Sequence, residues 1–90
     1  MEKILTKHPQ GKHGKNIDKS TYDLFEKAIR EVLNGKELTQ IELFIVLNKK
    51  LDGKFDGNIS WYGETMKLDM EARGIVKRTN DKPQKYFLTK

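Results

Sequence analysis

Two histidines near the N-terminus are the residues of this sequence that come closest to metal or acid–base chemistry. His8 and His13 both lie in "HPQGKH", but a transition-metal site needs third and fourth ligands at a recognisable spacing, which this segment lacks. No acidic residue accompanies them as an orienting partner, and the chain has no cysteine nucleophile. Ser20 and Ser60 fall where helices are expected to begin, so helix capping accounts for them. We therefore predict a protein that is not an enzyme and that uses no metal and no cofactor.

The lysines and arginines have a distribution that does predict a partner. The formal net charge of the chain is +5. Residues 1–19 have five lysines and two acids, residues 20–73 have eight basic residues and ten acids, and residues 74–90 have five basic residues and one acid. Both ends are therefore basic around a slightly acidic body, which favours contact between the ends and a polyanion. Composition leaves open the alternative that these lysines only keep a small protein soluble.

Two helices are predicted in the first part of the acidic body. The first begins at Ser20, with Asp23 completing a variant capping box, and ends at Asn34-Gly35 after apolar residues at helical spacing. The second begins with the capping box Thr39-Gln40-Ile41-Glu42 and closes at Gly53.

A third helix is predicted from Ile59-Ser60 to about Arg73, after two Asp-Gly turns. Its apolar arc is about 200° wide, so the helix should be covered on two sides. Trp61 and Tyr62 fall on this arc and are expected to belong to the core, with room for one of them to be partly exposed, although either could stack on a base. Asp69 and Arg73 also fall on it, one turn apart, and are expected to form a structural ion pair.

After the third helix the pattern changes from helical to extended. "IVKRT" is β-branched and basic, "NDKP" is typical of a turn, and "QKYFLT" alternates aromatic and polar residues, so a β-hairpin is predicted. Its apolar side, with Ile75, Tyr86 and Leu88, must pack against the third helix. At the other end of the chain, residues 1–19 form a basic N-terminal arm. "KILT" is a candidate edge strand there, and residues 7–19 are expected to lack regular structure.

The order helix, helix, helix, hairpin resembles that of winged helix-turn-helix domains, especially those of bacterial transcriptional regulators. In such domains the end of the recognition helix has the pattern apolar-Glu-x-x-Gly-apolar-apolar-x-Arg. The residues in those places are Met70, Glu71, Gly74, Ile75, Val76 and Arg78. The chain as a whole also resembles a small, uncharacterised bacterial winged-helix family. The resemblance covers residues 20–90 and implies an α+β fold, mainly α, in which a three-helix core carries a C-terminal two-stranded β-hairpin wing.

This resemblance implies a bacterial, cytoplasmic protein that binds double-stranded DNA as a transcriptional regulator. The second helix would cross the DNA backbone, the third would lie in the major groove, and the wing would touch flanking phosphates. The predicted DNA contacts are Thr39 and Gln40 of the second helix, Ser60, Glu64 and Lys67 of the third, Lys77, Arg78, Lys82 and Lys85 of the wing, and Lys12 and Lys15 of the arm.

The expected outer face of the third helix leaves a second function open. Ser60, Gly63, Glu64, Lys67 and Glu71 give this face two acids and one lysine, which suits a basic protein better than phosphates. A winged-helix protein–protein interaction module without DNA binding is therefore the alternative. We expect a monomer or a small homodimer, because no dimerisation helix follows the wing. No segment is apolar enough to suggest a membrane span.

Overall fold

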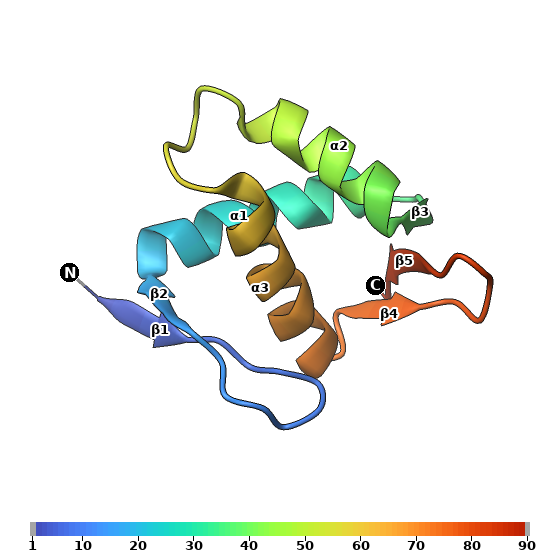
Figure 1. The fold of residues 1–90 in the computed structure, drawn as a ribbon, viewed down its shortest axis with the longest axis horizontal. Coiled ribbons are helices and arrows are strands. Elements are labelled where there is room, and N and C mark those ends of the chain that lie inside the picture. The colour runs from blue at the N-terminus through green and yellow to red at the C-terminus, as the bar shows by residue number, and fades with distance from the viewer. Residues whose placement is uncertain (1, 90) are drawn as a thin grey trace.

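Three helices and two small antiparallel sheets form the fold (Figure 1). The computed structural model describes residues 2–89 of the chain. The elements are β1 (Lys3–Leu5), β2 (Asn16–Asp18), α1 (Lys19–Leu33), β3 (Leu38–Thr39), α2 (Gln40–Leu51), α3 (Ile59–Ala72), β4 (Val76–Arg78) and β5 (Lys85–Leu88). The predicted α+β class, mainly helical, is confirmed. Among the described residues, no helix combines the length and the apolar character that crossing a membrane requires.

The core lies where α1, α2 and α3 meet, and each helix packs against the other two. Its side chains follow helical spacing in the sequence. The fully buried ones include Phe25, Ile29 and Leu33 of α1, Leu43 and Leu47 of α2, and Met66 and Met70 of α3. Residues four apart lie on one face of a helix, so each helix buries one apolar side.

The predicted start of α2 is confirmed in its hydrogen bonds. Thr39 Oγ1 accepts from the Glu42 N–H at 3.2 Å, and Glu42 Oε1 accepts from the Thr39 N–H at 2.9 Å. The two bonds satisfy backbone donors that the first helical turn leaves unpaired. The ends of α1 and α2 also agree with the predictions, since Gly35 and Gly53 follow them with φ angles of 68° and 76°. These left-handed conformations are easy only for glycine.

The predicted N-cap of α1, Ser20, is wrong by two residues. Ser20 lies inside the helix, which begins at Lys19 with Asp18 at the N-cap position. No side chain caps this end. The chain enters α1 directly from β2, which ends at Asp18. A paired strand therefore leads into the helix, where the prediction had a loop ending in a capping residue.

The C-terminal hairpin, residues 76–88, is confirmed, and a third strand that the sequence did not reveal is paired with it. β4 pairs antiparallel with β5, and β3 pairs antiparallel with the other edge of β5. Thr39 pairs with Lys85 in this sheet and also caps α2. The hairpin is therefore fixed to the start of α2. Its buried side chains are Val76 and Tyr86, whereas Ile75 and Leu88 are only half-buried.

The N-terminal arm is more ordered than predicted. The candidate edge strand is confirmed as β1, but residues 16–18 also form a strand, β2, which pairs with it antiparallel. Residues 6–15 form the connection between them, as expected for a segment without helix or strand. Ile17 of β2 is buried in the core and holds this hairpin against the helices.

Candidate nucleic-acid interface

The solvent-facing side of α3 lies between the loop of the N-terminal arm and the C-terminal hairpin (Figure 1). A shallow groove connects the three elements. Its lining residues are His8, Pro9, Gln10 and Lys12 of the arm, Glu64, Leu68 and Glu71 of α3, and Arg78 of the hairpin. The arm and the hairpin thus form two walls, and α3 forms the floor between them.

The arm is held against α3 by the buried carboxylate of Asp69. Its Oδ1 atom accepts from the backbone N–H of Lys7 at 2.8 Å, and its Oδ2 atom accepts from the Tyr22 hydroxyl at 2.7 Å. Arg73 donates to the same Oδ2 atom and also pairs with Glu26 of α1 at 2.7 Å. The predicted Asp69–Arg73 ion pair is confirmed, and it is structural because it joins the arm, α1 and α3.

This network shifts the ionisation of the groups around Asp69. Burial and the hydrogen bond to Asp69 raise the pKa of Tyr22. Burial alone would raise the pKa of Glu26, but hydrogen bonds and charge from Arg73 and Arg30 lower it overall. Asp69 and Glu26 therefore each have a hydrogen-bonded cationic partner, which offsets the cost of burying Asp69 and half-burying Glu26.

The loop of the arm closes tightly where Gly14 meets Thr6. The Thr6 N–H donates to the Lys15 carbonyl at 2.9 Å, and Thr6 Oγ1 accepts from the Lys15 N–H at 2.8 Å. A Cβ atom on Gly14 would lie 1.7 Å from the Thr6 carbonyl oxygen. Only glycine fits there, so the loop has a defined conformation that presents Lys12 and Lys15 beside α3.

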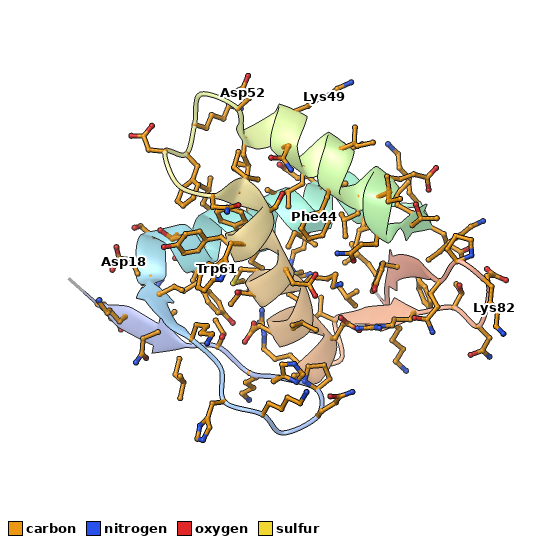
Figure 2. All side chains as sticks on the ribbon, in the orientation of Figure 1. Asp18, Phe44, Lys49, Asp52, Trp61 and Lys82 are labelled. Atoms are coloured by element: carbon orange, nitrogen blue, oxygen red, sulfur yellow. The ribbon has the colours of Figure 1, made fainter. Side chains whose placement is uncertain are left out.

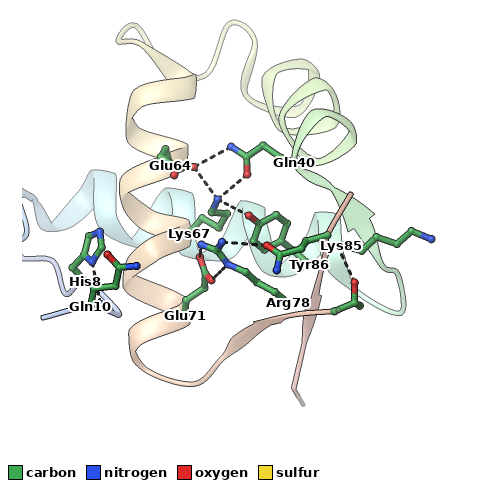
Figure 3. A network of polar contacts seen from close by, with 11 residues as sticks. His8, Gln10, Gln40, Glu64, Lys67, Glu71, Arg78, Lys85 and Tyr86 are labelled. Atoms are coloured by element: carbon green, nitrogen blue, oxygen red, sulfur yellow. Dashed lines mark hydrogen bonds and ion pairs between the residues drawn. The ribbon is translucent and has the colours of Figure 1, made fainter. Parts of the chain in front are cut away.

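Lys67, predicted to face DNA, is buried and faces the inside of the protein. It is 2% exposed, and its Nζ atom donates to Gln40 Oε1 at 2.7 Å and to the Tyr86 hydroxyl at 3.2 Å. It also pairs with Glu64 Oε1 at 2.9 Å (Figure 3). The lysine therefore joins α2, α3 and β5 at one point. Its burial is tolerated because several polar atoms surround the ammonium group.

Glu64 and Gln40, two further predicted contacts, belong to the same cluster. Gln40 Nε2 donates to Glu64 Oε1 at 3.0 Å. Burial would raise the pKa of Glu64, but hydrogen bonds from Lys67 and Gln40 and the charge of Lys67 lower it overall. The carboxylate is thus ionised and neutralised from within the protein. The amide nitrogen and the amide oxygen of Gln40 both form hydrogen bonds within the protein, so the side chain is held in this cluster and is not directed toward a base.

Arg78 and Glu71 form the second neutralised pair of the interface. The Arg78 guanidinium donates through Nε to Glu71 Oε1 and through Nη2 to Glu71 Oε2, the latter at 3.2 Å. This two-bond geometry matches a planar guanidinium to a carboxylate. The hydrogen bond to Glu71 raises the pKa of Arg78, whose guanidinium also lies 5.2 Å from the centre of the Tyr86 ring. The Arg78 guanidinium is therefore already engaged by Glu71 and Tyr86 within the protein.

The remaining predicted contacts are lysines of the arm and of the C-terminal hairpin, of which Lys12 lines the groove. Lys12, Lys15, Lys77 and Lys82 are exposed and Lys85 is half-buried. The ion pairs among residues 2–89 involve none of these five lysines. Lys82 lies at the far tip of the C-terminal hairpin (Figure 2). The charges of these five lysines are therefore not neutralised by an ion pair within the described residues.

Thr39 and Ser60 have structural hydrogen bonds. Thr39 caps α2, and its side chain is half-buried. Ser60 is exposed, and its hydroxyl accepts from Asn48 Nδ2 at 3.3 Å. N-terminal backbone amides of α2 beside Thr39 remain the part of that helix suited to a phosphate.

Of the two aromatics expected in the core, Tyr62 packs against it and Trp61 is the one that is partly exposed. Tyr62 packs against Phe25 and Phe55, with ring centres 5.8 Å and 5.0 Å apart. Trp61 is 44% exposed on the first turn of α3 (Figure 2). It lies at the edge of the predicted apolar arc, and no other element of the described chain covers that edge fully.

His8 and His13 of the arm are not surrounded by further metal ligands in the described part of the chain. Within residues 2–89, no group of three or more His, Cys, Asp or Glu side chains is placed to hold a metal ion. His8 Nδ1 accepts from the Gln10 N–H at 3.1 Å, which shapes the loop.

Taken together, these features define a small α+β protein with a three-helix core flanked by two hairpins. The chain belongs to the family described as "Family of unknown function (DUF6958)", whose sequence model matches residues 3–86. The match begins in β1, so the arm is part of the family's common unit. No curated protein and no solved structure matches the chain.

Proposed function

We propose that this protein is a winged-helix protein that binds double-stranded DNA. In this proposal α3 is the recognition helix, the C-terminal hairpin is the wing, and the arm loop is a second basic contact beside α3. The pairing of the hairpin with β3 supports the comparison with winged-helix domains, because it connects the proposed wing to the proposed helix-turn-helix pair α2–α3. Exposed lysines of the arm and of the hairpin, which flank α3 on its two sides, would supply contacts to phosphates.

One observation carries the proposal: both acids on the face of α3 are neutralised within the protein. Glu64 is paired with the buried Lys67, and Glu71 is paired with Arg78. The net negative charge expected on this face is thereby removed, while lysines without acidic partners remain on both sides of it. The same observation takes away the main reason for the protein–protein alternative, which was an acidic recognition face.

The geometry supports binding that depends little on base sequence. Base reading relies mainly on side chains that make bidentate contacts in the major groove, such as Arg, Asn and Gln. On α3 the exposed residues are instead Ser60 and Trp61, and the half-buried Glu64 is already paired. Affinity should therefore come mostly from phosphate contacts. If the protein regulates transcription, its sites on DNA would then be determined by recruitment to particular places more than by a strict operator sequence.

The test is the salt dependence of binding to a labelled random duplex, followed by fluorescence anisotropy. The unsubstituted protein should bind more weakly as salt rises, with a linear dependence of log K on log salt concentration. The double variants Lys12→Ala/Lys15→Ala and Lys77→Ala/Lys82→Ala should each reduce the slope, by up to about 1.8 if both lysines touch phosphates.

A matched control removes two exposed lysines that lie away from the proposed interface. Lys27 on α1 and Lys54 after α2 are exposed, and Lys27→Ala/Lys54→Ala lowers the net charge by the same amount. The control should leave the slope nearly unchanged. Absence of binding at low salt, or an equal loss of slope in all three double variants, would contradict the proposed interface.

A further inference from the structure

A stripe of apolar side chains on α2 has no partner in the described chain. Ile41 is 72% exposed and Ile45 is 53% exposed, one helical turn apart. Together with Phe44 and Asn48 they line a shallow groove along the helix. Two isoleucines exposed this far on one face cost solvation free energy, which favours a covering surface. Gln40, which also belongs to the Lys67 cluster, lines the same groove at the N-terminal end of the stripe.

The charged residues beside the stripe suit a second copy of the same helix. Glu42 lies three residues before Ile45 and Lys49 lies four residues after it, so both flank Ile45 on the exposed face. The ion pairs among residues 2–89 include neither Glu42 nor Lys49. In an antiparallel pair of α2 helices centred on Ile45, each Glu42 would lie beside the other copy's Lys49.

We propose that this face binds a second copy of the chain, with the two α2 helices antiparallel across a twofold axis near Ile45. Such an interface is isologous, because the same patch serves both copies. The apolar stripe covers itself, and the acidic end of one stripe meets the basic end of the other. A partner of one charge sign would leave one of the two ends facing a like charge.

The expected dimer is weak and depends on concentration. α2 has 12 residues, a length of about 18 Å, so one helix face buries less than the ~800 Å² per partner of a standard interface. Sedimentation equilibrium of the full chain, from about 10 µM to about 1 mM, should show a mass rising from 10.5 kDa toward twice that value. A constant monomer mass over this range would overturn the proposal.

Substitutions on the stripe distinguish association through this surface from non-specific association. Ile41→Ser/Ile45→Ser and Lys49→Glu should each shift the association to at least about tenfold higher concentration, corresponding to ~1.4 kcal/mol. The controls are Leu5→Ser, which removes an apolar side chain 63% exposed on β1, and Lys27→Glu on α1. Controls that weaken association as much as the stripe variants would count against the proposal. Glu42→Gln tests the acid while keeping an oxygen that can accept from the Thr39 N–H.

Disulfide formation tests the direction of the pairing, because the chain has no cysteine of its own. Ile45→Cys should form a disulfide-linked dimer readily, since the two copies of residue 45 would face each other across the axis. Lys49→Cys is the matched control on the same helix, and it should crosslink slowly because antiparallel helices separate its two copies. Equal or faster crosslinking through residue 49 would overturn the antiparallel arrangement.

Discussion

The Oδ1 atom of Asp69 on α3 accepts a 2.8 Å hydrogen bond from the backbone N–H of Lys7, which lies 62 positions earlier in the chain. The other carboxylate oxygen, Oδ2, is occupied by Tyr22 and Arg73. This buried carboxylate therefore fixes the start of the arm loop against α3, in addition to the packing of Ile17 in the core. Any contact that the arm loop makes with a ligand depends on this anchor.

Replacing Asp69 with Ala should lower the free energy of unfolding by about 3 kcal/mol. The change leaves the Arg73 guanidinium without one of its two acids and leaves the Tyr22 hydroxyl without its acceptor. Urea unfolding measures the loss, and hydrogen exchange at the Lys7 amide should become faster. Asp23→Ala, at an exposed ion pair with Lys19, is the control and should change little. A small effect of Asp69→Ala would mean that the carboxylate is not the anchor.

Replacing Thr39 with Ala should cost about 1 kcal/mol of stability, because the capping box of α2 is lost. Ser20→Ala offers an internal comparison. Ser20 lies inside α1 and is not the N-cap, so alanine should be neutral or slightly stabilising there. Thermal or urea unfolding of the two variants gives the comparison directly. If Ser20→Ala cost as much as Thr39→Ala, the start of α1 at Lys19 would be wrong.

Replacing Lys67 with Met should destabilise the protein by about 2 kcal/mol without removing a phosphate contact. Gln40 and Tyr86 each lose a hydrogen-bond partner inside the protein. The salt slope of duplex binding should therefore stay close to that of the unsubstituted protein, whereas Lys82→Ala should lower it by about 0.9. Anisotropy titrations of both variants make the measurement. A slope lowered equally by Lys67→Met would place that ammonium group at the DNA.

Stability should fall in acid partly because of Glu64. The folded-state pKa of Glu64 is below its ordinary value of 4.5. The contribution of its carboxylate to the free energy of unfolding is therefore complete above the ordinary value and is lost as pH falls through the folded-state pKa. In this window the unfolded chain binds the proton first. Urea unfolding across pH 2 to 7 should therefore show a shallower acid decline for Glu64→Gln than for the unsubstituted protein. Identical declines would mean that Lys67 and Gln40 do not hold the carboxylate.

The helices and the C-terminal hairpin could be predicted because their signals are local. Apolar residues four apart, the Thr39–Glu42 box and glycines at helix ends need no knowledge of the rest of the chain. β3 escaped prediction because a strand of two residues is too short to show alternation. β2 escaped because "NID" is paired by a strand that lies eleven residues away and by burial of Ile17 in the core.

The candidate site was predicted less well because its polar groups are set by distant partners. The Asp69–Arg73 pair follows from helical spacing, but the Lys7 amide and Glu26 that complete it come from other elements. Lys67 was placed outside because a lysine beside an acidic face is normally solvated. Its burial depends on Gln40 and Tyr86, which only the folded chain brings together. Propensity and periodicity carry no such information.

The exposure of Trp61 has a practical consequence, because it is the single tryptophan of the chain. Its indole stands half-open to water on the first turn of α3, in edge contact with the Tyr62 ring at 4.8 Å. The tryptophan emission of the protein therefore arises from one place on the proposed recognition helix. Quenching by acrylamide or a shift in emission wavelength can follow occupancy of that surface without any added label.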